Sequence, residues 1–185
     1  MVSVTMPRRR SPSWLSVFFG STTPGPVVDI ALVITRIALA WIFIYYGGAK
    51  LFSWFPGTGG PHGIHATSLY MANSAHLRPG GFFAVLSGLI EFGGGIAVAA
   101  GFFTRLAALS LFGDMVMAMI TITWTTGINS PGAPPGYQLN LAIAAPALAL
   151  ALIGAGRISV DALIARAFGR AGQVQRLDGV APALR

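Results

Sequence analysis

The stretch Val27–Phe52 reads VVDIALVITRIALAWIFIYYGGAKLF and decides the fold class. Its charged side chains are Asp29 at the start, Arg36 inside and Lys50 near the end. A helix needs about 20 mainly apolar residues to cross the roughly 30 Å hydrocarbon core of a bilayer. We therefore predict that this stretch forms one membrane-spanning helix, long enough to tilt.

Three further apolar blocks follow, at about Gly81–Gly101, Thr104–Thr126 and Tyr137–Ile153. The short Phe102–Arg105 link makes the first two an antiparallel hairpin, and the proline-rich stretch Asn129–Gly136 separates the last two. The composition agrees, because 54% of residues are hydrophobic, 9% are charged and the mean hydropathy is +0.70. We predict an all-α fold, a transmembrane four-helix bundle.

The basic residues predict the orientation of this bundle. Cytoplasmic loops of membrane proteins carry an excess of Lys and Arg. Nine basic residues fall on one side of the predicted spans: Arg8, Arg9, Arg10, Arg105, Arg157, Arg166, Arg170, Arg176 and Arg185. Lys50 and Arg78 fall on the other side. We expect a multi-pass protein of the inner or plasma membrane with both termini in the cytoplasm.

Outside the spans we expect three smaller features. In the outward-facing loop, His65–Leu77 is predicted to form a short extracytoplasmic surface helix. Residues 1–26 form a cytoplasmic arm in which Trp14–Gly20 is an interfacial anchor or disordered, and its apolar run is too short for a signal peptide. Residues 27–161 form the membrane domain. Residues 162–185 form a cytoplasmic basic tail on the lipid surface, with partner binding as the alternative.

Several kinds of chemistry are not expected. The sequence pI of about 11.1 would suggest nucleic-acid binding in a soluble protein, but here the basic residues flank apolar spans, so we predict no nucleic-acid partner. Without cysteine the chain has no disulfide or iron–sulfur ligands. His62, His65 and His76 all lie in the outer loop, so we predict no axial haem pair within a span and no metal site.

Four ionisable residues at or near membrane depth are the candidate site: Arg36, Lys50, Glu91 and Asp114. A charge at the bilayer centre costs at least about 2.5 to 3.5 kcal/mol on insertion scales. Lys50 follows Arg36 by fourteen positions, which places both on one face of the first helix. We expect Arg36 to bridge Glu91 and Asp114. This cluster is either a structural bridge that fixes helix register or a proton-linked, headgroup-binding site.

Small residues on the same faces indicate close helix contact, since lipid supplies no hydrophobic force between helices. We predict that a ligand groove lies beside the charges. Its candidate lining residues are Tyr46, Gly47, Gly88, Gly94, Gly95 and Gln138.

The order of motifs resembles the DoxX family. Arg36 is followed by Gly47-Gly48-Ala49-Lys50-Leu51-Phe52, which is similar to that family's glycine-x-x-lysine-leucine-phenylalanine signature. The segments 88–95 and 100–105 look like its second span and turn, and 154–161 (GAGRISVD) looks like its closing motif. This chain has Tyr46 where the family often has histidine, and Gln138 where it often has an acidic residue.

The resemblance implies a four-helix membrane protein related to a subunit of a thiosulfate-oxidising, quinone-reducing complex. We expect an accessory or quinone-interacting subunit of a membrane oxidoreductase system, working with membrane lipid and with other membrane or peripheral subunits. A cofactor, if there is one, would be quinone. The alternatives are a carrier or chaperone for lipid or a small apolar solute, and a structural docking subunit without chemistry. Whether the chain forms a homo-oligomer is left open.

Overall fold

The computed structural model describes residues 25–55, 60–129 and 136–168. Almost all of the predicted N-terminal arm, including the Trp14–Gly20 segment, and most of the predicted basic tail lie outside these ranges. Within them every regular element is a helix.

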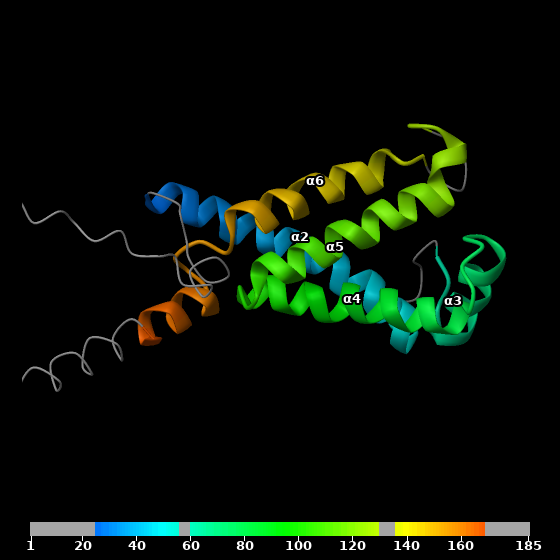
Figure 1. Ribbon diagram of the computed structural model, residues 1–185, viewed down its shortest axis with the longest axis horizontal. Helices are drawn as coiled ribbons and strands as arrows, with labels where there is room; N and C mark the ends of the chain where they lie inside the picture. The colour runs from blue at the N-terminus through cyan, green and yellow to red at the C-terminus, as the bar shows by residue number, and fades with distance from the viewer. Residues whose placement is uncertain (1–24, 56–59, 130–135, 169–185) are drawn as a thin grey trace, which may run out of the picture.

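Four apolar helices form the body of the protein and run side by side, each antiparallel to the next (Figure 1). They are α2 (Pro26–Phe52), α4 (Gly80–Ala100), α5 (Thr104–Ala118) and α6 (Gln138–Ile153). Helix α2 packs mainly on α4, and α5 packs mainly on α6. The predicted all-α bundle is confirmed.

The two ends of the bundle differ. A short helix, α3 (Gly63–Asn73), lies at one end and packs on α4, which confirms the short helix predicted in the long loop. Helix α2 begins at the opposite end, where the helical segment 160–168 also lies (Figure 1). We call these the α3 end and the termini end.

In the part of the chain that the structure describes, three helical stretches are long and apolar enough to cross a membrane: Pro26–Phe52, Gly80–Ala100 and Thr104–Thr126. Helix α6 is also apolar but has 16 residues, about 24 Å at 1.5 Å per residue. The fourth predicted span is thus present as a helix of the bundle that is shorter than the other three.

Glycine and proline set the helix limits at the termini end. Helix α2 starts with Pro26 after Gly25, where a proline costs nothing because the first helical N–H has no partner within the helix. Helix α4 ends at Gly101, whose φ of 70° is left-handed. Its N–H donates to Val98 O at 3.1 Å, and Phe102 N–H donates to Ala97 O at 2.9 Å. The chain then turns at once into α5.

The third predicted helix is not regular throughout. After Ala118 it continues as a π-helical turn, η1 (Met119–Thr123), and a 3₁₀ turn, η2 (Trp124–Thr126). The hydroxyls of Thr121 and Thr126 donate to the carbonyls of Met117 and Thr123. Such threonine bonds compete with the regular backbone pattern and favour local bending.

The core lies where all four helices meet. It contains Leu39, Phe43, Val98, Leu111, Ile143 and Leu150. Large apolar side chains also cover the outside of the bundle, among them Trp41, which is 76% exposed, and Leu152, which is 68% exposed. An exterior this apolar is expected to face lipid, because a continuous hydrophobic surface of this extent is unfavourable in water.

Candidate functional site

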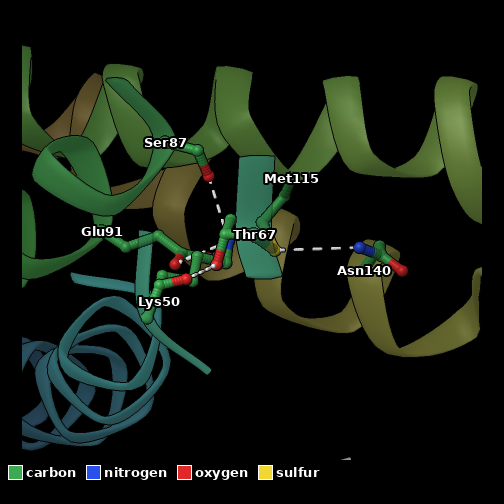
Figure 2. Close-up of polar contacts among 7 residues, drawn as sticks. Lys50, Thr67, Ser87, Glu91, Met115 and Asn140 are labelled. Carbon is green, nitrogen blue, oxygen red and sulfur yellow. Dashed lines mark hydrogen bonds and ion pairs between the residues drawn. The ribbon is translucent and has the colours of Figure 1, made fainter. Parts of the chain in front are cut away.

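An ion pair between α2 and α4 is the centre of the candidate site (Figure 2). Lys50 Nζ lies 2.8 Å from Glu91 Oε2 and donates to Ser87 Oγ at 3.0 Å. Glu91 is 3% exposed, and the Lys50 side chain 19%. Ser87 and Glu91 are one helical turn apart, so α4 presents both oxygens to the same ammonium.

Asp114 of α5 completes the cluster, and its side chain hydrogen-bonds with Ser87 and Glu91. The ammonium of Lys50 thus contacts Glu91 directly, and Asp114 joins through Ser87 and Glu91, so the two carboxyl groups come from different helices. A hydrogen bond between two carboxyl groups requires that one of them carries a proton. Such an arrangement can accept and release a proton with little movement, and it presents both donors and acceptors to a small polar group.

Two cavities adjoin this cluster, and both are lined by Lys50. The first, about 330 Å³, lies among α3, α4 and α5 and contains Asp114 and Ser87 in its wall. The second, about 300 Å³, lies among α2, α5 and α6 and contains Glu91 and Asn140 in its wall. The remaining lining of both is mainly apolar, which is typical of small-molecule sites with a few fixed polar groups.

The π-helical turn η1 lies at the junction of the two cavities. Ile122, within it, and Ala118, just before it, line both. A π turn inside an α-helix shifts the side chains that follow it and occurs frequently at functional sites. In this chain it brings Thr123 to Asn140 of α6, with Thr123 Oγ1 and Asn140 Oδ1 3.3 Å apart.

Sequence reasoning missed two contributors, Asn140 and Tyr70. Asn140 is a polar residue inside the apolar fourth block, and its Nδ2 lies 4.0 Å from Met115 Sδ (Figure 2). The sequence signal was therefore present at Asn140. Tyr70 of α3 lines both cavities, but it lies in the outer loop, and no periodicity linked that loop to the bundle interior.

The expected bridge from Arg36 to Glu91 and Asp114 is wrong. Arg36 is 4% exposed and donates to four carbonyls at the termini end. Its acceptors are Val98 O at 2.9 Å, Ala99 O at 2.8 Å, Ala155 O at 2.9 Å and Ile158 O at 2.7 Å. Val98 is seven residues beyond Glu91, about 11 Å along α4 at 1.5 Å per residue. Lys50, not Arg36, is the cation of the acid pair.

The physical reason lies at the end of α4. The last four carbonyls of a helix lack partners within it, and at membrane depth such groups cost several kcal/mol each. A guanidinium has five N–H donors in a planar fork. Arg36 supplies four of them to the end of α4 and to the turn after α6, which makes it a structural clamp between three segments.

Two aspartates reinforce the same end. Asp161 accepts from Phe103 N–H at 2.8 Å and Thr104 N–H at 3.0 Å, so it caps the start of α5. Asp29 accepts from Arg157 N–H at 2.8 Å and pairs with the Arg157 side chain at 3.8 Å. The closing motif at 154–161 therefore ties the chain after α6 to the beginnings of α2 and α5.

The six residues predicted to line a groove are distributed differently. Tyr46 lines the second cavity. Gln138 hydrogen-bonds with Asn129 Oδ1 at 3.3 Å and lines neither cavity.

The four glycines line neither cavity and serve helix packing, which corrects the predicted groove. A Cβ on Gly47 would lie 2.5 Å from the backbone nitrogen of Phe92. Added Cβ atoms on Gly88, Gly94 and Gly95 would lie within 2.6 to 3.1 Å of side chains of the facing helices. Small residues bring these helices together, as expected in a membrane, but leave no groove there.

Over the described ranges, no three histidine, aspartate or glutamate side chains are grouped so that they could hold a metal ion. The Lys50 cluster itself contains an ammonium, two carboxyl groups and a serine hydroxyl, and the amide of Asn140 lies in the wall of the second cavity.

Comparison with known proteins agrees with the fold and the motifs. The chain is 30% identical over 138 residues to the inner membrane protein YqjF of Escherichia coli K12, covering 74% of this chain and 93% of that protein. It is 31% identical over 146 residues to the inner membrane protein YphA of the same organism, covering 77% and 93%. No solved structure matches it. The DoxX family model matches residues 31–124, and the chain belongs to the DoxX family.

Proposed function

We propose that this protein is a quinone-binding accessory subunit of an inner-membrane oxidoreductase system. The observation that carries the proposal is the position of Lys50 between two mainly apolar cavities, bound to Glu91 and Ser87. A quinone ring is apolar with carbonyl acceptors at its edges, and its quinol form has hydroxyl donors. The ammonium of Lys50 can donate to the quinone carbonyls, and the carboxyl oxygens of the cluster can accept from the quinol hydroxyls.

Membrane placement supports a lipid-soluble ligand. Leu86 and Met117 line the first cavity and are 39% and 42% exposed. These partly exposed apolar lining residues support entry of an apolar molecule from the side, without passage through water. Electrons would come from a partner subunit, and this chain would supply the hydrogen bonds and protons. We further propose that the termini face the cytoplasm, since Arg105, Arg157 and Arg166 gather at the termini end.

The direct test is quinone binding by the purified full-length protein in detergent micelles, using a short-chain benzoquinone as the probe. We expect saturable binding that Lys50→Met and Glu91→Gln each weaken about tenfold or more, equivalent to about 1.4 kcal/mol. Glu91→Gln keeps the side-chain shape and serves if Lys50→Met does not fold. Absence of saturable binding in the wild type would refute the proposal.

Two exposed helical glycines give a matched control for the cavity itself. An added Cβ meets nothing within 4 Å at either Gly113 or Gly93, but Gly113 lines the first cavity and Gly93 lines neither. We expect Gly113→Leu to weaken quinone binding and Gly93→Leu to leave it unchanged. If an alkane probe binds, and responds to Gly113→Leu but not to Lys50→Met, the protein is instead a carrier for apolar solutes.

A further inference from the structure

A separate cavity of about 760 Å³ lies at the termini end, between the start of α2, the end of α4 and the segment 157–166. Among the described residues, three arginines line it, Arg36, Arg157 and Arg166, together with one carboxylate, that of Asp29. These lining residues carry a net charge of about +2. The Lys50 cluster contributes nothing to this cavity, so it is a different site.

The three arginines make different contacts. Arg36 gives four donors to backbone carbonyls and is buried, so it belongs to the scaffold. Arg157 directs Nε toward Asp29 Oδ2 at 3.8 Å, and Arg166 donates from Nη2 to the Arg157 carbonyl at 3.3 Å. Each of these contacts engages one nitrogen of the guanidinium. These two contacts orient the exposed side chains of Arg157 and Arg166 at the edge of the cavity. Each contact uses one of the five N–H donors of a guanidinium.

The walls between the arginines are apolar and face outward. Ile30, Ile158 and Leu163 line the cavity and are 54%, 58% and 61% exposed. They lie near the start of α2 and just after α6, beside the ends of apolar helices that are long enough to span a membrane, and the ends of spanning helices meet the headgroup region of a bilayer. Paired cations beside apolar walls match a molecule with a negative head and a hydrocarbon tail. A free phosphate ion would gain nothing from the apolar part.

We infer that this cavity binds an anionic phospholipid, with Arg157 and Arg166 holding the phosphate group and Ile30, Ile158 and Leu163 lying along an acyl chain. Arginine suits this task because its planar fork can give two parallel hydrogen bonds to phosphate oxygens. The inference is independent of the proposed quinone site, since it uses other residues at the opposite end of the bundle.

The test is native mass spectrometry of the full-length protein released from micelles that contain phosphatidylglycerol or phosphatidylcholine. We expect the wild type to retain phosphatidylglycerol and the double variant Arg157→Gln/Arg166→Gln to lose at least about tenfold in affinity. Arg78→Gln is the matched control, because Arg78 is an exposed arginine near the α3 end and does not line this cavity. Arg166→Gln alone, expected to lose a smaller part, serves if the double variant does not fold.

Further arms separate lipid from free phosphate. Glycerol phosphate should fail to displace the bound lipid, and Leu163→Gln should weaken lipid binding. Equal retention of phosphatidylglycerol by the wild type and the arginine variants would overturn the inference. So would displacement of the lipid by glycerol phosphate at similar concentration, which would identify a site for soluble phosphate.

Discussion

Arg36→Met removes the clamp at the termini end and should destabilise the whole bundle. Methionine has a similar length and no hydrogen-bond donor. The substitution withdraws four donors from Val98 O, Ala99 O, Ala155 O and Ile158 O. Val98 O also accepts from Gly101 N–H at 3.1 Å, so it keeps one partner.

The magnitude follows from what is left behind. A hydrogen bond from a charged group contributes about 1.5 to 3 kcal/mol, but bonds made by one side chain are not independent. Leaving one buried carbonyl without its donor costs about 1 to 3 kcal/mol, and after partial relaxation of the four carbonyls the sum is about 3 to 5 kcal/mol. We expect a loss in this range for Arg36→Met. The free energy of unfolding of Arg36→Lys should lie between those of the wild type and Arg36→Met, because an ammonium has three donors and no planar fork.

The assay is equilibrium unfolding of the purified protein in mild detergent micelles by added dodecyl sulfate, followed by tryptophan fluorescence. Arg78→Met provides the control, since it makes the same chemical change at an exposed position and should alter the free energy of unfolding by less than about 0.5 kcal/mol. If Arg36→Met is as stable as Arg78→Met, the carbonyl contacts do not hold the three segments together and the reasoning fails.

Two further predictions use the same unfolding assay. Gly47→Ala should lower the free energy of unfolding by about 1 to 3 kcal/mol, because the added Cβ would lie 2.5 Å from the Phe92 backbone nitrogen. At Gly93 an added Cβ meets nothing within 4 Å, so Gly93→Ala should be neutral or stabilise by up to about 1 kcal/mol. Equal effects of the two substitutions would contradict close packing at Gly47. Asp161→Ala should cost about 1 to 2 kcal/mol and speed amide exchange at Thr104, since the start of α5 loses its cap. Unchanged exchange there would show that Asp161 has another role.

The sequence predicted the candidate site in part. Polar groups are costly in hydrocarbon, so Glu91 and Asp114 were recognisable as interior residues from their positions in apolar blocks. Lys50 was placed on the interior face of its helix by its spacing from Arg36. Helical spacing shows which way a side chain points around the helix axis, but it does not identify the partner of that side chain. Whether Arg36 or Lys50 pairs with the two acids depends on the depth of each side chain in the packed bundle. The glycine pattern likewise indicated contact without distinguishing a groove from a tight interface.

Composition and hydrophobic block length alone determined the all-α class and the helix limits to within a few residues, because a bilayer permits few backbone arrangements and a helix satisfies its own hydrogen bonds. The tertiary structure alone decided that Arg36 clamps the termini end while Lys50 joins two cavities. Those roles depend on which carbonyls and carboxyls from distant segments come within about 3 Å of each cation. That proximity results from packing all the helices at once and is not encoded in any one of them.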